Sequence, residues 1–445
     1  MDYISNIIFG VLLLSTAAVF ALRVKKIRRN ILLGRSDKRN DKKVQRFKYM
    51  LRVAVGQGKM IKKPVVGALH IIVYVGFVII NLEVLEIIID GLLGTHRVFA
   101  GFIGVIYDVL IGSFEILALG VLLACVVFIV RRVSKRIKRL DGVEMTKWPK
   151  NDAHIILYAE IILMTAFLLM DAADQQLQII GFKGYVKAGS FPVSGLLSPL
   201  MGVFNGETLF IIERSCWWFH IIGILAFLNY LPFSKHFHIL LAFPNVYFAK
   251  LLPKGQFDNM ENVKKEVELM MDPNADPYAA APQQDPNAAS PAPFGAKDIN
   301  DLSWKSIMDA YTCTECGRCT EQCPANQTGK LLSPRKIMMD VRDRTEEFGK
   351  LLDEKGEKAA DNKLLINDYI TAEELWACTS CNACVEACPV SIDPLAVIVD
   401  LRRYLVMEQS QAPNELNIMF GNVENNGAPW AFPAADRFNW ANEED

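Results

Sequence analysis

The sequence lacks the short motifs that mark nucleotide-binding and hydrolytic sites. It contains no Walker loop, no GxGxxG turn and no Ser-His-Asp set, so nucleotide and hydrolase chemistry have no support. Runs of alternating β-branched residues are also few, which disfavours a ferredoxin domain of the βαββαβ type. Only six of the 445 residues are histidine and ten are cysteine. These residues are few enough to be considered one by one.

Eight of the ten cysteines form the same pattern twice. Both copies read C-x-x-C-x-x-C-x-x-x-C-P. Three thiolates two residues apart surround a [4Fe–4S] cube from one tight loop, and the fourth cysteine, followed by proline, ligates the other cube. We therefore assign the first cluster to Cys313, Cys316, Cys319 and Cys388, and the second cluster to Cys378, Cys381, Cys384 and Cys323.

Zinc and disulfides are weaker interpretations of these cysteines. Structural zinc uses paired C-x-x-C knuckles rather than three consecutive steps closed by Cys-Pro. Persistent disulfides belong to oxidising compartments, whereas the expected topology puts this domain in the cytoplasm. The two remaining cysteines, Cys125 and Cys216, lie in apolar segments and are expected to behave as small buried hydrophobes.

The first half of the chain is apolar and interrupted by basic blocks. With 51% hydrophobic residues overall, it contains about five runs that reach the length of about 20 residues needed to cross a bilayer. The basic residues that follow the first and third runs place both connections in the cytoplasm. The first run is not a signal peptide, because its charges follow it rather than precede it. The expected spans are 4–22, 65–89, 102–130, 153–170 and 209–231.

These features predict an all-α protein, with a five-helix transmembrane bundle followed by a small helical dicluster [4Fe–4S] ferredoxin domain. Residues 1–250 would form the membrane domain, 251–298 an amphipathic helix and linker, 299–410 the cluster domain, and 411–445 a partner-docking tail. Residues 272–293 are rich in Pro, Ala, Gln and Asp and are expected to be a flexible tether. In a bacterial inner membrane, the N-terminus would lie outside and the cluster domain in the cytoplasm.

Four histidines are candidate ligands of b-type haem. His220 and His238 lie 18 residues apart, which corresponds to five turns and about 27 Å if one helix carries both. His70, in the second span, is expected at the same depth as His238, so we pair these two. For His220 the candidate partners are His96 and His154. His154 is also a candidate to replace either partner of the first pair, or to line a quinone pocket.

Other interpretations of the polar residues in the spans remain open. Histidines at helix ends also act as ordinary interface anchors, although buried ionisable residues in spans are costly and usually functional. His236 is expected on a nearly opposite helix face from His238 and is a poorer candidate ligand. Four carboxylates either relay protons to a quinone or pair with Arg97, Arg214 or backbone donors to hold helices together. They are Glu83, Glu86, Glu115 and Glu160.

Two parts of the sequence resemble known families. Residues 217–220 (Trp-Trp-Phe-His) and 232–238 (Pro-Phe-Ser-Lys-His-Phe-His) resemble the gamma subunit of respiratory nitrate reductase and the membrane subunit of heterodisulfide reductase. The doubled cysteine motif resembles the dicluster iron–sulfur subunit of heterodisulfide reductase. The fusion of the two is similar to membrane-bound iron–sulfur oxidoreductases of the electron-transfer-flavoprotein:menaquinone oxidoreductase type.

The sequence departs from these families at two points. The nitrate reductase gamma subunit carries a second haem histidine on the helix equivalent to the second span, at a position that Ile80 occupies here. Larger relatives of the fused type continue into CCG domains, and this sequence contains no CCG motif. Residues 414–440 resemble the connector that precedes those domains, so a separate CCG-domain subunit is expected to dock there. Exposed aromatic residues would favour an interface in this tail: Trp430, Phe432, Phe438 and Trp440.

The sequence and its resemblances together imply a membrane-bound electron-transfer subunit. Two [4Fe–4S] clusters and one or two b-type haems would carry electrons between a cytoplasmic partner and menaquinone or ubiquinone. The expected partner is an electron-transfer flavoprotein or a CCG-domain iron–sulfur subunit. The alternative is a haem-free membrane anchor and iron–sulfur wire for a separate catalytic subunit. Nucleic-acid binding is disfavoured, because the basic residues flank spans and are explained by orientation.

Overall fold

The fold is helical throughout the described part of the chain. The computed structural model describes residues 2–134, 137–253, 255–274, 293–356 and 359–442. These ranges contain no β-strand, and their only two isolated β-bridges join Arg35 to Ser303 and Ile366 to Ile370. The expected all-α class is therefore confirmed. Of the expected tether, residues 275–292 lie outside the described ranges.

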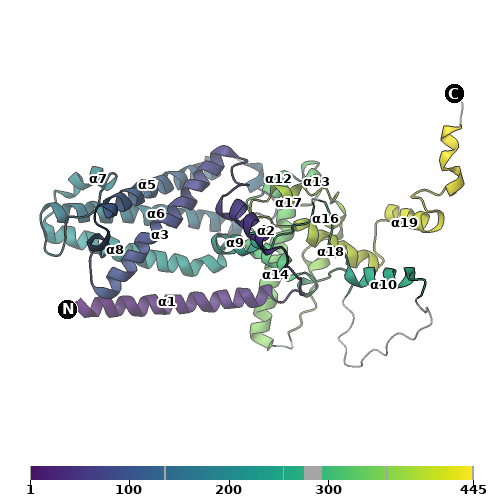
Figure 1. Cartoon of the computed structure of the whole chain (residues 1–445), viewed down its shortest axis with the longest axis horizontal. Coiled ribbons are helices and arrows are strands. Elements are labelled where there is room, and N and C mark those ends of the chain that lie inside the picture. The colour runs from purple at the N-terminus through teal and green to yellow at the C-terminus, as the bar shows by residue number, and fades with distance from the viewer. Residues whose placement is uncertain (1, 135–136, 254, 275–292, 357–358, 443–445) are drawn as a thin grey trace.

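Five helices of the described chain are long and apolar enough to cross a membrane. They are α1 (Asp2–Ile31), α3 (Pro64–Leu93), α5 (Val105–Ser134), α6 (Lys147–Ile179) and α8 (Gly206–Tyr230). Figure 1 shows these helices side by side, with the cluster domain at one end and the N-terminus at the other. We refer to these as the cluster end and the far end of the bundle. The five-helix bundle agrees with the expectation from the sequence.

Local sequence signals set the ends of these helices. Pro64 occupies the first turn of α3, where its missing N–H group is not needed. Gly94 ends the same helix in the left-handed conformation, at φ 72°. Asn205 caps α8 by accepting a hydrogen bond from the Thr208 backbone N–H, at 2.9 Å.

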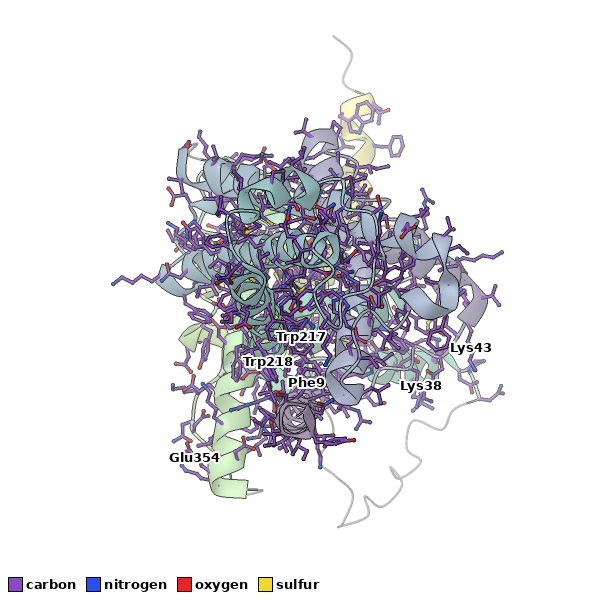
Figure 2. The ribbon with its side chains drawn as sticks, turned by 90° about the vertical axis from the view of Figure 1, so that its left-hand side faces the viewer. Phe9, Lys38, Lys43, Trp217, Trp218 and Glu354 are labelled. Atoms are coloured by element: carbon purple, nitrogen blue, oxygen red, sulfur yellow. The ribbon has the colours of Figure 1, made fainter. Side chains whose placement is uncertain are left out.

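Helix α1 lies along one edge of the bundle and is attached there by aromatic contacts. Figure 2 shows Phe9 of α1 next to Trp217 and Trp218 of α8, and the ring centroids lie 5.5 and 6.0 Å apart. Phe9 is fully buried, whereas many of the other apolar side chains of α1 are exposed. This exposure fits a helix whose outer face contacts lipid.

Helix α6 continues well past the expected end of the fourth span at residue 170. It runs to Ile179, so Asp171 and Asp174 lie inside a helix rather than in an external loop. Both carboxylates form ion pairs with Arg97, which reaches them from the loop after α3, at 2.7 and 2.6 Å. Because this pairing compensates the buried charges, the helix continues where unpaired acids would have ended the span.

His220 and His238 do not share a helix, so this expectation is wrong. Helix α8 ends at Tyr230, and two short 3-10 turns precede α9 (His238–Tyr247). The turns are η3 (Leu231–Phe233) and η4 (Lys235–Phe237). Pro232 accounts for the break, because proline has no N–H group and its ring clashes with the preceding turn of a helix. The separation derived from a continuous helix therefore does not hold.

Short helices occupy the connections between the spans. They are α2 (Lys43–Met50), the π-helix η1 (Leu51–Val55), α4 (Ala100–Ile103), η2 (Lys138–Leu140) and α7 (Ser194–Met201). After the bundle, α10 (Glu261–Met271) lies within residues 251–298, where an amphipathic helix and linker are expected. The basic connection between α1 and α3 thus contains two helical segments, α2 and η1.

The cluster domain consists of helices around the two cysteine loops. They are η5 (Ile299–Asp301), α11 (Trp304–Thr312), α12 (Arg318–Glu321), α13 (Pro324–Gln327), α14 (Pro334–Lys355), α15 (Leu365–Asp368), α16 (Ala372–Trp376), α17 (Ala383–Ala387) and α18 (Pro394–Met407). Helix α14 starts with Ser333 as its cap and with a proline in its first turn. Two further helices, α19 (Asn414–Asn426) and η7 (Ala434–Ala441), extend away from the domain (Figure 1).

The cluster domain packs directly against the bundle. A single hydrophobic core contains Ile27 of α1, Phe237 of η4 and Ile307 of α11. Within this contact, the buried Lys305 ammonium group of α11 donates a hydrogen bond to the Asn245 side-chain oxygen of α9, at 3.0 Å. The two domains therefore meet through a shared, partly polar core.

Candidate redox site

Four cysteines line one small pocket between the two cysteine loops: Cys313, Cys316, Cys319 and Cys388. They are the same four residues that the spacing assigned to the first cluster. Gly317, in the same loop, has φ 71°, and a Cβ atom there would come within 2.5 Å of the Arg139 carbonyl oxygen. The tight approach of the loop to the bundle therefore requires glycine at this position.

The other four cysteines influence one another electrostatically. Burial raises the pKa of Cys323, and the thiols of Cys378 and Cys381 raise it further. Burial also raises the pKa of Cys384 to a value far above its usual range, and Cys378 and Cys323 contribute to this increase. Thiols that raise each other's pKa lie close together. The deprotonated form of a buried thiol is favoured when bound iron balances its negative charge. Three residues of this set come from one loop and the fourth from the other.

The two cysteine sets face different surroundings. Of the ten cysteines, all of which lie in the described ranges, Cys381 alone is exposed. Cys316 of the first set lines a second, much larger cavity as well as its own pocket, and Thr314 and Pro389 also line both. The first cysteine set is therefore next to the bundle, and the second set reaches the solvent.

The large cavity lies at the cluster end of the bundle. Its volume is about 450 Å³, which lies within the range of about 300–1,000 Å³ typical of small-molecule pockets. Four histidines line it: His70, His220, His236 and His238. The cavity thus has the volume of a small-molecule pocket and contains imidazoles on its wall.

Hydrogen bonds orient two of these imidazoles. The Nδ1 atom of His220 lies 3.0 Å from the Leu163 carbonyl oxygen, and the Nδ1 atom of His238 lies 2.9 Å from the Lys235 carbonyl oxygen. A carbonyl oxygen only accepts hydrogen bonds, so Nδ1 is the protonated atom in each ring. The unprotonated Nε2 atom is then available as a metal ligand, in the arrangement common among metal-binding histidines.

Two further observations fit iron ligation at the cluster end. Burial, followed by the nearby His238 and His70, lowers the pKa of His236 to about 3, and burial also lowers the pKa of His238. Neutral imidazole is the form that binds a metal. The Nδ1 atom of His70 is buried and has no hydrogen-bond partner among the described residues. The donor set is therefore suitable for haem iron.

His236, which the sequence indicated as a poorer candidate ligand, lines the cavity together with His238. Its ring centroid lies 5.5 Å from that of His238, and both rings line the cavity. The expectation that they face opposite sides assumed a continuous helix, whereas the chain bends between Tyr230 and His238. The Pro232 signal within the sequence marks this bend and was the available clue.

Neither expected partner of His220 lines the cavity. His96 lies at the far end, 3.4 Å from the Asp174 carboxylate and with its ring centroid 4.5 Å from that of Tyr185. His154 is on α6, and its Nε2 atom is buried without a hydrogen-bond partner in the described part of the protein. His220 therefore faces the cavity without either of these histidines opposite it.

The four glutamates of the spans have different surroundings. Glu86 accepts hydrogen bonds from the Phe99 backbone N–H and the Tyr107 hydroxyl, both at 2.8 Å. Glu115 accepts hydrogen bonds from the backbone N–H groups of residues 193 and 194 and from the hydroxyl of residue 194. The Oε2 atom of Glu83 is buried without a partner among the described residues, and Glu160 lines the large cavity. Glu86 and Glu115 thus hold structure together.

Comparison with known proteins agrees with the cluster assignment. Residues 312–392 match the family described as the 4Fe-4S dicluster domain. This range contains all eight cysteines of the doubled motif. The chain therefore carries a domain for two [4Fe–4S] clusters.

The similarity to curated proteins extends over most of the chain. It is 27% identical over 433 residues to a probable iron-sulfur-binding oxidoreductase FadF of Bacillus subtilis, covering 90% of this chain and 56% of that protein. It is 27% identical over 428 residues to an EtfAB:quinone oxidoreductase of Syntrophomonas wolfei, covering 91% of this chain and 55% of that protein. The chain thus spans about half the length of these two relatives. No solved structure matches it.

Another similarity covers a shorter part of the chain. One subunit of the ferredoxin/F(420)H(2)-dependent CoB-CoM heterodisulfide reductase of Methanosarcina acetivorans is 34% identical over 107 residues, which is 24% of this chain and 52% of that protein. The chain is therefore related to iron–sulfur proteins of electron transfer.

Proposed function

We propose that this chain is the membrane-bound electron-transfer part of a quinone-linked oxidoreductase. Bound in its sites, two [4Fe–4S] clusters and b-type haem would supply one-electron carriers between a redox partner at the cluster end and menaquinone or ubiquinone in the membrane. Similarity to iron–sulfur oxidoreductases over 90% of the chain supports this function. The name of the second relative, an EtfAB:quinone oxidoreductase, supports the choice of quinone and of an electron-transfer flavoprotein.

One observation carries the proposal: Cys316 lines both the pocket of four cysteines and the histidine-lined cavity. A cluster ligand on the wall of the histidine-lined cavity supports an arrangement in which the two candidate carrier sites are neighbours. The first cluster would therefore be the one nearest the membrane, and the second cluster would be the one nearest the partner.

His70 and His238 are the residues that would hold haem iron at the cluster end. They come from α3 and α9 and line the same cavity. Both also lie close enough to His236 to lower its pKa. His236 is an alternative to His238, because its ring lies against it. His220 is the residue that would hold a second haem.

Glu160 is the proposed proton carrier. It is the glutamate of the four in the spans that lines the cavity, and its carboxylate forms no hydrogen bond with the described residues. Reduction of a quinone to a quinol consumes two protons, so a carboxyl group on the cavity wall is suited to deliver them. His154, on the same helix, is not on this wall and is a poorer candidate for a quinone pocket.

Two exposed features support a partner at the solvent side of the cluster domain. Cys381 brings the second cluster site to the surface. In the tail, Trp430, Phe432, Phe438 and Trp440 are each more than half exposed. Exposed aromatic residues of this number favour an interface. The proposed partner is an electron-transfer flavoprotein or a CCG-domain iron–sulfur subunit.

The proposed orientation puts the cluster domain in the cytoplasm. The connection after α1 and the end of α5, which are rich in lysine and arginine, lie at the cluster end of the bundle. The positive-inside rule assigns such segments to the cytoplasm. With five spans, the N-terminus would then lie outside, in the inner membrane of a bacterium.

A haem-free anchor with two clusters is the second candidate function. It is favoured by Ile80, which lines the cavity where the nitrate reductase gamma subunit would carry a histidine, and by the absence of His96 and His154 from the wall. In that case the cavity would hold quinone or lipid alone.

A reduced-minus-oxidised spectrum with haem and iron quantitation tests the proposal. The wild type is expected to contain b-type haem and about eight irons for two [4Fe–4S] cubes. His70→Ala and His238→Ala should lose the same haem and keep their iron. His96→Ala, at the far end of the bundle, is the control and should keep both. Iron without haem in the wild type would refute the cytochrome and leave the haem-free anchor.

A further inference from the structure

The cluster end of the large cavity has a strongly basic wall. Five cationic side chains line it, but the only carboxylate on the wall, among the described residues, is Glu160. The five are Arg131, Arg132, Arg139, Lys235 and Arg318. A wall with this charge imbalance attracts anions, and the attraction is strong in a cavity with apolar surroundings.

Two of the five cations already have protein partners. The Lys235 ammonium group forms an ion pair with the Glu315 carboxylate and donates a hydrogen bond to the Pro149 carbonyl oxygen at 2.6 Å. Arg318 donates a hydrogen bond to the Lys59 carbonyl oxygen at 3.2 Å, which satisfies only part of its guanidinium group. The charge of Lys235 is thus balanced, whereas that of Arg318 is not balanced by this contact.

Arg139 and Arg132 are poorly compensated. The Arg139 side chain is 10% exposed, and its buried Nη1 atom has no hydrogen-bond partner among the described residues. The carboxylate it approaches, Glu321, is 3.9 Å away and forms an ion pair with Lys63. Arg132 is partly buried and forms no ion pair with the described residues, although the more distant charges of Glu315 and Asp152 act on it. A buried guanidinium group without an anion is unfavourable, so the wall lacks an anionic partner.

The remainder of the cavity indicates what kind of molecule carries that anion. Apolar side chains such as Val73, Phe77, Phe128 and Leu157 line the same space. A free inorganic anion would leave this apolar surface uncovered. An amphiphile with an anionic head and an apolar body satisfies both parts of the wall.

We propose that Arg132 and Arg139, together with Arg318, bind the anionic group of an amphiphilic ligand whose apolar body occupies the cavity. Carboxylate and phosphate oxygens are both suited to the guanidinium fork. If the anionic group is a carboxylate, it comes from the two propionates of a haem, and this carboxylate source rests on the proposed function. If it is a phosphate, it comes from the headgroup of an anionic phospholipid, and this phosphate source does not depend on haem.

Titration of the full-length protein with two probes tests the site. Protein purified from haem-depleted cells and washed free of lipid is titrated with haemin and, separately, with short-chain phosphatidylglycerol. Arg139→Met and Arg132→Met are each expected to bind one of the probes about ten-fold more weakly, the loss expected for a charge-assisted hydrogen bond. Lys138→Met is the matched control, because this exposed lysine is next to Arg139 but is not on the wall. The iron content reports folding.

The outcomes separate the sources and the two proposals. Weaker haemin binding in the arginine variants identifies the carboxylate source, and weaker phosphatidylglycerol binding alone identifies the phosphate source. A wild type that binds no haemin contradicts the haem of the proposed function but leaves the phosphate arm to decide the site. Equal binding of both probes by the wild type and the arginine variants overturns the anion site. If the methionine variants lose iron, Arg139→Gln and Arg132→Gln are compared in the same way.

Discussion

At the scale of single residues, the two cysteine loops differ in charge at equivalent positions. The residue before the second cysteine is Glu315 in the first loop and Ser380 in the second, and both adopt positive φ angles of 52° and 55°. Two positions after that cysteine, Arg318 corresponds to Ala383. The Glu315 carboxylate is 4% exposed and forms ion pairs with Lys235 of the bundle and Arg342 of α14. Only the loop next to the bundle carries these charges.

The Glu315→Gln variant is predicted to raise the reduction potential of the first cluster. At an effective dielectric constant of about 20, a neighbouring unit charge contributes on the order of 1–2 kcal/mol, or on the order of 50–100 mV for one electron. Loss of the negative charge makes the cluster easier to reduce, so the potential rises. The measurement is a redox titration followed by electron paramagnetic resonance.

The control for this prediction is Asp343→Asn, because Asp343 contacts the same Arg342 at 3.3 Å but is mostly exposed. Its effect on the first cluster should be much smaller, since water screens an exposed charge. The signal of the second cluster should stay unchanged in both variants. Equal shifts of the two clusters in Glu315→Gln would mean that the variant acts through general loosening of the domain.

At the scale of elements, the bend between α8 and α9 determines which histidines meet. Asp152 of α6 holds this bend: its carboxylate accepts hydrogen bonds from the Tyr230 hydroxyl at 2.5 Å and from the Lys235 backbone N–H at 3.1 Å. Asp152 is 2% exposed. His236 and His238 follow Lys235 directly in the sequence. The hydrogen bonds of Asp152 therefore help to orient these two proposed ligands.

Asp152→Ala is predicted to lower the haem content of the protein at least ten-fold without loss of iron. The variant removes two hydrogen bonds to a charged group, each worth about 1.5–3 kcal/mol, and so frees the bend. Tyr230→Phe removes one of the two bonds and should have a clearly milder effect. Haem and iron are measured on the same purified samples. Full haem content in Asp152→Ala would show that the bend is held by Pro232 and packing alone.

At the scale of the whole molecule, the cluster domain is fixed to the bundle by a buried ion pair as well as by the shared core. Arg335 of α14 is fully buried and donates to Glu144, which precedes α6, with a distance of 2.8 Å from Nε. Burial raises the pKa of Glu144, but Arg335 and the Ser333 hydroxyl lower it to a value below the usual range. The carboxylate therefore stays charged and compensates the arginine.

Glu144→Ala is predicted to release the cluster domain from the bundle. Removal of one partner leaves a buried, uncompensated charge, which costs about 3–5 kcal/mol. A protease site is placed within residues 275–292, the chain is cleaved in membranes, and the fragment that remains bound is measured after sedimentation. Glu354→Ala, at an exposed position near the end of α14 (Figure 2), is the control and should keep the fragment bound. Retention of the fragment in Glu144→Ala would assign docking to the apolar core.

Removal of the residues after Gly427 is predicted to abolish capture of the partner. The deleted segment contains the exposed aromatic side chains of the tail. Among them, the rings of Phe438 and Trp440 stack with their centroids 6.4 Å apart. Loss of such anchors typically costs a large part of the binding energy of an interface. A pull-down with the full-length chain as reference measures this, and the iron content should stay at the wild-type value. Undiminished co-purification of the partner would place the docking site elsewhere, for example around Cys381.

The sequence by itself determined the parts of this protein that depend on local spacing and composition. Runs of apolar residues predicted five spans, because a bilayer imposes length and polarity on each helix separately. The doubled cysteine motif predicted which four residues gather in the first pocket, because the ligand spacing of a cube is built into one short loop and one distant cysteine.

Only the tertiary structure decided which distant residues share one space. In the folded chain, Cys316 and His236 line the histidine-lined cavity, whereas His96 and His154 do not. It also extended α6 past Asp171, because Arg97 arrives from another part of the chain. These results depend on a bend and on pairings between separate helices, and neither is fixed by the periodicity of a single segment.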